Sequence, residues 1–248
     1  MNAGLLSLRF PCGRIELECP PEIPAPPTSS IELARNLPKC SGASVLDLGC
    51  GIGLFAVVAA KSGAREVWAV DADPIAAAAA RRNVERNRVS VHVEEGDWFQ
   101  PVGDRRFDLI VTNPPQTPAP PGASHPKFGG PDGLLHFRRI LADAPRHLAP
   151  GGQLLTLVLS IADTREFRAI AEARFRLEDL GRRRRDFTPS EYEGYHPGLF
   201  AHLADRRRLG GAEFEEDAGG WYFWIRYFRA RPCEPGAGRD ILPSVPQE

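Results

Sequence analysis

The sequence predicts an α/β fold: a Rossmann-like, doubly wound and mostly parallel seven-stranded sheet with helices on both faces. Three observations lead to this prediction. Short apolar runs alternate with helical patterns through the middle of the chain, which is typical of parallel sheets covered by crossover helices. A glycine-rich turn, "LGCGIG", joins the first of these runs to a helix. Two strand-like runs near the end complete the sheet, and we expect the C-terminal one to be antiparallel.

The elements are expected in the following order. Residues 1–27 form an N-terminal arm or hairpin, since the alternating run "GRIELE" precedes the proline-rich "CPPEIPAPP". A helix begins at Thr28, where Thr28 or Ser29 can cap it and Glu32 stands three residues after Ser29. Strands and helices then alternate: strand 43–49, helix 53–63, strand 65–71, helix 73–87, strands 89–97 and 107–113, helix 133–150 and strand 151–160.

The C-terminal part has a different pattern. Residues 174–188 and 221–231 predict two more strands, and the aromatic run "WYFWIRYF" is expected to be buried on both faces. Residues 187–220 are predicted to form an insertion on the ligand side of a domain that spans residues 28–232. Residues 233–248 are expected to be a flexible tail.

The composition excludes several classes of protein. Lys and Arg number 31 against 32 Asp and Glu, so no overall charge points to nucleic acid or membrane. Five cysteines without a C-x-x-C pair suggest reduced thiols rather than disulfides or a zinc site, so no metal is expected. Neither an export signal nor a membrane span is apparent. A cytoplasmic protein is therefore expected.

The glycine turn is the first candidate site. Gly49, Gly51 and Gly53 let the backbone come close to a ligand beside a helix N-terminus, and Asp71 closes the next strand about twenty residues later. The spacing also satisfies a dinucleotide pattern, which leaves a nicotinamide cofactor open. Asp47 argues against it, because a carboxylate there would repel a pyrophosphate but suit an ammonium and a sulfonium.

Four motifs in this order carry a resemblance. "VLDLGCGIG", "VWAVDADP", "EEGDWF" and "FDLIVTNPPQ" resemble the successive motifs of class I S-adenosylmethionine-dependent methyltransferases. The Asn-Pro-Pro motif is similar to that of the release-factor glutamine and small-domain N-methyltransferase branch. The resemblance covers roughly residues 28 to 160, and it implies that residues 28–232 form a methyltransferase domain with S-adenosylmethionine as cofactor.

The resemblance also implies roles for the cofactor residues. Asp47 and the loop from Gly49 to Gly53 would hold the methionine part, and Asp71 would bind the ribose. Asp97 would accept from the adenine amino group, with Trp98 packing beside the ring. Asp73, by contrast, is expected to cap a helix that begins at Pro74.

The elbow "NPPQ" is the candidate catalytic element. By resemblance Asn113 and Pro114 face the acceptor, and the prolines fix two oxygens that can accept the acceptor's N–H bonds and stabilise positive charge on its nitrogen. Pro115 and Gln116 are expected to touch the acceptor. In the enzymes that this sequence resembles, the residue at the position of Gln116 is usually aromatic and stacks on a planar amide or base. Glutamine instead favours recognition of the acceptor through hydrogen bonds.

Further acceptor contacts are expected from two segments. The glycine-rich run "FGGPDG" can fold over the site, and its Asp132 can pair with a cationic acceptor or start a helix. In the predicted insertion, Tyr192, Tyr195 and His196 are candidates to line the acceptor pocket.

The sequence thus predicts methyl transfer to an amino or amide nitrogen of a small-molecule or amino-acid-like acceptor. The alternative acceptor is RNA, or a protein that is methylated on glutamine. The arginine runs "GRRRRDF" and "DRRRLG" could contact the phosphates of RNA. The remaining alternative is not an enzyme but a module that binds S-adenosylmethionine or nucleic acid without turnover. The intact Asn-Pro-Pro elbow disfavours such a module.

Overall fold

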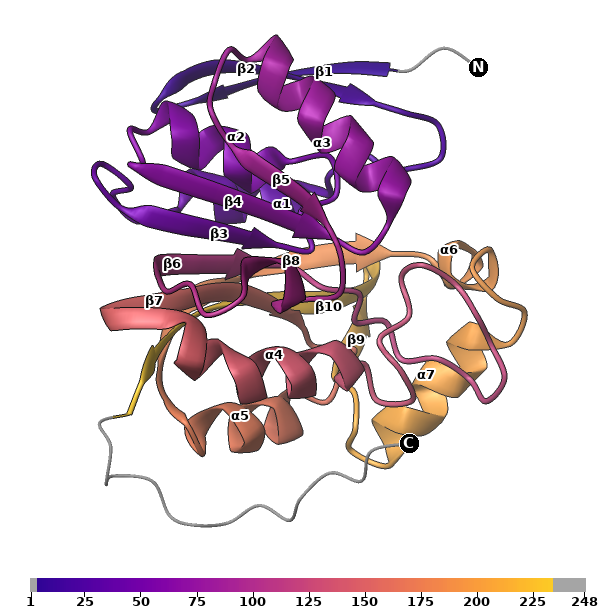
Figure 1. Cartoon of the computed structure of the whole chain (residues 1–248). Helices are drawn as coiled ribbons and strands as arrows, with labels where there is room; N and C mark the ends of the chain where they lie inside the picture. The colour runs from indigo at the N-terminus through magenta and orange to yellow at the C-terminus, as the bar shows by residue number, and fades with distance from the viewer. Residues whose placement is uncertain (1–3, 234–248) are drawn as a thin grey trace.

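The computed structural model describes residues 4–233 and contains one eight-stranded sheet and a separate hairpin (Figure 1). The sheet order is β5-β4-β3-β6-β7-β10-β8, and short β9 pairs with β10. Neighbouring strands from β5 to β7 are parallel, whereas β10 is antiparallel to both β7 and β8. The strands of the sheet are β3 (Ser44–Leu48), β4 (Glu66–Asp71), β5 (His92–Glu95), β6 (Phe107–Thr112), β7 (Leu148–Leu159), β8 (Phe175–Phe187), β9 (Phe214–Asp217) and β10 (Gly220–Pro232). The predicted fold class is confirmed, with β9 as an additional strand.

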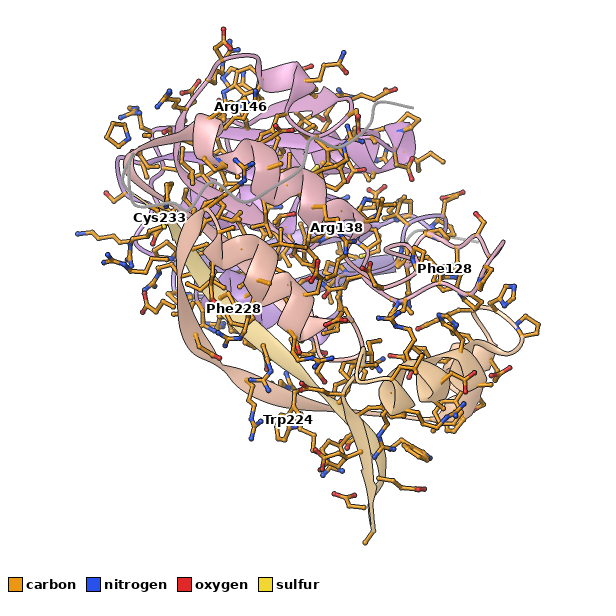
Figure 2. The ribbon with its side chains drawn as sticks, turned by 90° about the horizontal axis from the view of Figure 1, so that it is seen from below. Phe128, Arg138, Arg146, Trp224, Phe228 and Cys233 are labelled. Carbon is orange, nitrogen blue, oxygen red and sulfur yellow. The ribbon has the colours of Figure 1, made fainter. Side chains whose placement is uncertain are left out.

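Helices cover both faces of the sheet and divide the core into two clusters. One face carries α1 (Thr28–Arg35), α2 (Leu54–Lys61) and α3 (Pro74–Arg86), and the other carries α4 (Leu135–His147) and α5 (Thr164–Glu172) (Figure 1). Figure 2 looks onto the second face, where the ring of Phe228 in β10 lies 5.4 Å from that of Phe167 in α5. Helix α5 was not among the predicted elements, although Asp163 caps it by accepting from the backbone N–H of Glu166.

The N-terminal hairpin of β1 (Gly4–Phe10) and β2 (Gly13–Cys19) docks on α3. Asn83 is fully buried; its Oδ1 accepts from the N–H of Glu18 at 2.6 Å, and its Nδ2 donates to Glu18 O at 3.0 Å. Asn87 pairs with both backbone groups of Glu16 in the same way. The two carboxamides therefore satisfy the edge of β2 as a neighbouring strand would.

The start of α1 departs from the prediction. Pro27 is its N-cap, and no side chain caps the helix, so the expected capping box of Ser29 and Glu32 does not form. Glu32 instead accepts from the hydroxyl of Tyr227 at 2.8 Å and pairs with Arg183. The side chain of Glu32 thus contacts partners on β8 and β10 instead of capping its own helix.

The carboxyl ends of the parallel strands meet at one edge of the sheet, on the right in Figure 1. The loop after β6 lies there beside α6 (Pro189–Glu193) and α7 (Leu199–Arg208), both from the predicted insertion. Within residues 4–233, no helix is long and apolar enough to cross a membrane. The predicted tail, apart from Cys233, lies outside the described residues.

Replacing Asn83 tests the docking of the hairpin. Asn83→Ala should lower the free energy of unfolding by about 1–3 kcal/mol, because partly buried backbone groups of β2 lose their partners. Denaturant melts would measure this. Asn36→Ala, at an exposed position, is the matched control and should change the stability by less than about 0.5 kcal/mol. Equal stabilities for the two variants would contradict the docking role.

Candidate cofactor and acceptor site

A cavity of about 730 Å³ opens at the carboxyl edge of the sheet, among the loops that follow β3, β4, β5 and β6 and beside α6. Most of the predicted site residues line it: Gly49, Gly51, Asp71, Asp97, Trp98, Asn113, Pro114, Pro115, Gln116, Tyr192 and Tyr195. Within the described part of the chain, the other predicted residues lie outside its lining: Asp47, Gly53, Asp132 and His196.

The three glycines of the turn have two different functions. Gly49 and Gly51 have φ of 72° and 54°, and a Cβ added at either would meet nothing within 4 Å. Their backbone therefore borders open space in the cavity. Gly53 is also left-handed, but a Cβ there would lie 3.2 Å from Cβ of Ala80 in α3. The missing side chain of Gly53 thus lets α2 pack closely against α3, and its expected contact with the cofactor stays a prediction.

Asp47 lies beneath the turn rather than in the cavity wall. It is fully buried, and its Oδ2 accepts from the N–H of Ala56 at 2.9 Å. Among the described residues Oδ1 has no hydrogen-bond partner. Burial raises the pKa of this carboxyl to about 8, and the negative charge of Asp71 adds to the rise. Asp47 lies outside the cavity lining, so the structure does not support its predicted direct contact with the methionine part. When deprotonated, the carboxyl can still act on a ligand in the cavity through its charge.

Asp71 connects the end of β4 to the glycine turn. Its Oδ2 accepts from the N–H of Gly51 at 2.7 Å, and its Oδ1 accepts from the N–H of Asp73 at 3.0 Å. Each oxygen keeps a second lone pair that can accept from a ribose hydroxyl. Asp73 caps α3 by accepting from the N–H of Ile75 at 2.8 Å, as predicted.

Asp97 and Trp98 form the next part of the wall, and two residues of α4 join them. Arg139 pairs with Oδ2 of Asp97 at 2.6 Å, and the ring of His136 lies 5.3 Å from that of Trp98. Both line the cavity. Sequence reasoning missed them, although their spacing of three residues puts them on one face of the helix.

These residues fit S-adenosylmethionine. The cradle of Gly49 and Gly51 is open, a carboxylate for the ribose stands beside it, and an acid with an aromatic ring follows for the adenine. The buried carboxyl of Asp47, whose Oδ1 lacks a partner within the described residues, suits a cationic ligand above it.

The elbow is held from two sides. Asn113 donates from Nδ2 to Oγ of Ser30 in α1 at 2.8 Å, and its Oδ1 accepts from Nε2 of Gln116 at 3.0 Å. Gln116 is only 4% exposed, and its Oε1 accepts from the N–H of Leu159 at 2.7 Å. The amide that was expected to recognise the acceptor is therefore engaged within the protein. Ser30 was not predicted, because only the fold brings α1 to this loop.

The glycine-rich segment after the elbow is packed against it. A Cβ at Gly129 would lie 2.6 Å from the carbonyl oxygen of Pro115, and one at Gly133 would lie 2.4 Å from that of Gln116. The N–H of Gly129 also donates to Thr117 O. The segment expected to fold over the site instead supports the elbow from outside.

Asp132 lies just before α4 and contacts it, although Leu134 is the N-cap of that helix and no side chain caps it. Its Oδ1 accepts from the N–H of Leu134 at 2.9 Å, and its carboxylate pairs with Arg138 of α4, labelled in Figure 2. Both contacts hold the chain that enters α4. The carboxylate contacts α4 and lies outside the cavity lining, so the structure does not support the predicted pairing of Asp132 with an acceptor.

Helix α6 and the residues that follow it form another part of the cavity wall. The hydroxyl of Tyr195 accepts from Nζ of Lys127 at 2.6 Å and donates to Glu191 at 3.0 Å, which ties α6 to the loop after β6. Tyr192 is buried, and burial raises its pKa. His196 follows the helix outside the lining, so the structure does not support its predicted contact with the acceptor.

The role of Asp71 can be measured directly. Asp71→Ala should weaken the binding of S-adenosylmethionine by about 1–3 kcal/mol, because charge-assisted bonds to the ribose and to the glycine turn are lost together. Isothermal calorimetry would show this. Asp104→Ala, an exposed acid outside this cavity, serves as control. Unchanged affinity in a folded Asp71 variant would exclude the ribose contact.

The raised pKa of Asp47 predicts a proton linked to cofactor binding. Near pH 7 the carboxyl is mostly protonated, because its pKa is about 8. A cationic ligand favours the carboxylate and lowers that pKa, so affinity should rise between about pH 6 and about pH 8 as a proton is released.

Calorimetry in two buffers of different ionisation enthalpy would measure the proton. Asp47→Asn retains an oxygen for the N–H of Ala56 and should remove this release. Equal proton release in parent and variant would show that Asp47 does not respond to the ligand.

Comparison with known proteins assigns the chain to a family. Residues 28–173 match the methyltransferase small domain. The chain is 40% identical over 155 residues to a release factor glutamine methyltransferase of Gloeobacter violaceus, which covers 56% of this chain and 53% of that protein. It is 44% identical over 126 residues to a ribosomal protein uL3 glutamine methyltransferase of Bradyrhizobium diazoefficiens, 45% of this chain and 39% of that one. The chain spans about half the length of the first curated relatives it matches.

Solved structures share the fold at low identity. The T. thermophilus 16S rRNA N2 methyltransferase RsmC, in complex with AdoMet and guanosine, superposes with a TM-score of 0.57 at 22% identity, over 73% of this chain and 48% of that one. A methyltransferase from Pyrococcus furiosus gives 0.54 at 19% identity, over 86% and 88%. The predictions of a class I methyltransferase fold and of S-adenosylmethionine as cofactor are confirmed at the level of the family, and the chain belongs to the methyltransferase small domain family, whose model matches more than half of it.

Proposed function

We propose that this chain transfers a methyl group from S-adenosylmethionine to the carboxamide nitrogen of a glutamine side chain in a protein of the translation machinery. One observation carries the proposal. Two oxygens, Oδ1 of Asn113 and the carbonyl of Pro114, belong to a rigid elbow that lines the same cavity as Gly49, Gly51 and Asp71. Relatives that act on glutamine in a release factor or in ribosomal protein uL3 support the choice of acceptor.

The elbow suits the chemistry of a carboxamide. S-adenosylmethionine supplies a methyl group activated by its sulfonium sulfur. An amide nitrogen is a poor nucleophile, because its lone pair is conjugated with the carbonyl. Asn113 Oδ1 and Pro114 O can accept hydrogen bonds from its two N–H groups, which orients the nitrogen. They also stabilise the positive charge that grows on the nitrogen as the N–C bond forms and the methyl–sulfur bond breaks, with neutral S-adenosylhomocysteine as the leaving group. One N–H proton then leaves to solvent.

Aromatic side chains elsewhere in the cavity can contact the flat amide. Tyr192 and Tyr195 of the α6 region and Phe223 of β10 line it. They offer the kind of surface that residue 116 supplies in the enzymes this chain resembles. We propose that the C-terminal insertion takes over this part of acceptor binding.

The relatives favour the alternative that the sequence left open over the small-molecule acceptor. The two curated relatives compared above are named for protein acceptors, a release factor and ribosomal protein uL3. A second alternative, RNA, loses the support of the arginine runs, because several of their members are paired with acids within the described chain: Arg183 with Glu32, Arg184 with Asp217, Arg185 with Glu191 and Arg208 with Asp205. The rigid elbow also disfavours a module without turnover.

Asn113→Ala tests the elbow. The variant should lower kcat by about 10²–10³, the scale for losing one preorganised polar contact in the transition state, while its affinity for S-adenosylmethionine barely changes. Asn36→Ala, outside the cavity, should behave as the parent. Methyl transfer to glutamine-containing release factors and ribosomal proteins, with mass spectrometry of the products, gives the rates and the modified atom.

The same assay can overturn the proposal. Methylation confined to RNA or to a low-molecular-weight fraction would exclude a protein glutamine acceptor. An Asn113→Ala variant with parental kcat would remove the elbow from the reaction.

A further inference from the structure

Gln116 stands at the position that is usually aromatic in the enzymes this chain resembles. The groups around its side chain suit both the oxygen and the nitrogen of a carboxamide. Its Oε1 accepts from the backbone N–H of Leu159 at 2.7 Å. Its Nε2 lies 3.0 Å from Oδ1 of Asn113, 3.4 Å from the carbonyl oxygen of Pro114 and 3.3 Å from that of Leu157. One donor thus meets the oxygen, and three acceptors surround the nitrogen.

We infer that Gln116 is a positioning residue, which holds the two oxygens of the elbow in place for the acceptor and does not itself bind it. The inference rests on the proposed function. The two oxygens proposed to receive the acceptor's N–H bonds are among the three that Nε2 contacts. A carbonyl oxygen has two lone pairs, so a bond to Gln116 leaves one for the acceptor.

The anchor of this arrangement is β7. Leu157 and Leu159 belong to the end of that strand, which is hydrogen-bonded to β6 and β10. Gln116 therefore connects the elbow to the rigid sheet, while Ser30 holds the opposite edge of the Asn113 amide. With both edges occupied, the amide of Asn113 cannot rotate without breaking a hydrogen bond.

Chemistry restricts the residue at this position. Glutamate has the same shape, but its carboxylate would put an oxygen against three oxygens and repel them. Protonated glutamate can donate one hydrogen bond there. Methionine has a similar volume, but it can neither accept well from Leu159 nor donate to Asn113.

Gln116→Glu is therefore the sharpest test. Its kcat should fall by about 10- to 100-fold at high pH, the scale for misplaced reacting groups, and recover as the pH falls and the new carboxyl takes up a proton. The KM for the acceptor should change little. Gln116→Met should lose activity to a similar extent at every pH. Gln100→Glu, at an exposed position outside the elbow, controls for the added charge and should keep the parental pH profile.

A readout without acceptor separates this inference from the proposed function. In ¹⁵N–¹H spectra of the full chain, the side-chain NH₂ resonances of Asn113 should titrate with pH in Gln116→Glu and exchange faster with solvent in Gln116→Met. Neither change is expected in the Gln100 control. Thermal melts would establish that each variant is folded.

Two results would overturn the inference. One is a folded Gln116→Glu or Gln116→Met variant in which the Asn113 resonances and kcat match those of the parent. The other is a rise in acceptor KM alone, which would mean that Gln116 contacts the acceptor directly. A failure of the proposed function looks different: the resonances would respond as expected, while no glutamine is methylated by any form.

Discussion

The side-chain amide of Asn113 is held at both edges, by Ser30 and by Gln116, and the arrangement of the acceptor side depends on this constraint. Without such partners, the side-chain amide of an asparagine at the end of a strand can rotate, so that its oxygen and nitrogen swap positions. Each partner comes from a different part of the fold. Ser30 belongs to α1 on one face of the sheet, and Gln116 is anchored to Leu159 at the end of β7. The orientation of the Asn113 side chain therefore depends on how α1 and β7 pack in the domain.

On the cofactor side, the constraint comes from the charges of carboxyl groups rather than from the direction of hydrogen bonds. Asp71 holds the glycine turn by accepting from the N–H of Gly51, while Asp47 is buried beneath the same turn with a raised pKa. Two carboxyl groups close together in a poorly solvated place disfavour a second negative charge. A ligand with positive charge relieves this repulsion, whereas a pyrophosphate would increase it. The turn is therefore suited to a sulfonium cofactor by its electrostatics as well as by its shape.

The C-terminal segments complete the sheet with β8 and β10 and border the cavity together with α6. β8 and β10 carry many arginines, yet their charges are largely balanced by local acids and by Glu32 of α1. These pairs are exposed for the most part, so each contributes little to stability. Their consequence is geometric, because they fix α1 and α6 relative to the sheet around the cavity. Tyr192, Tyr195 and Phe223 supply aromatic surface to the same cavity that the glycine turn lines.

The sequence by itself determined the alternation of strands and helices, the glycine turn, the acids at the ends of β4 and β5 and the elbow at the end of β6. These features are local: each depends on a few adjacent residues, on periodicity or on a helix cap such as Asp73. Only the tertiary structure decided which of these residues face the cavity. Gly53 turned out to pack against Ala80, Asp132 to pair with Arg138, and Gln116 to bind Leu159. Those contacts join residues from separate elements, and a hydrogen bond or a steric contact across the fold leaves no periodic trace in the chain. The contact between Ser30 and Asn113 could not be predicted for the same reason. The two residues are 83 positions apart, and nothing near Ser30 in the sequence indicates that they meet.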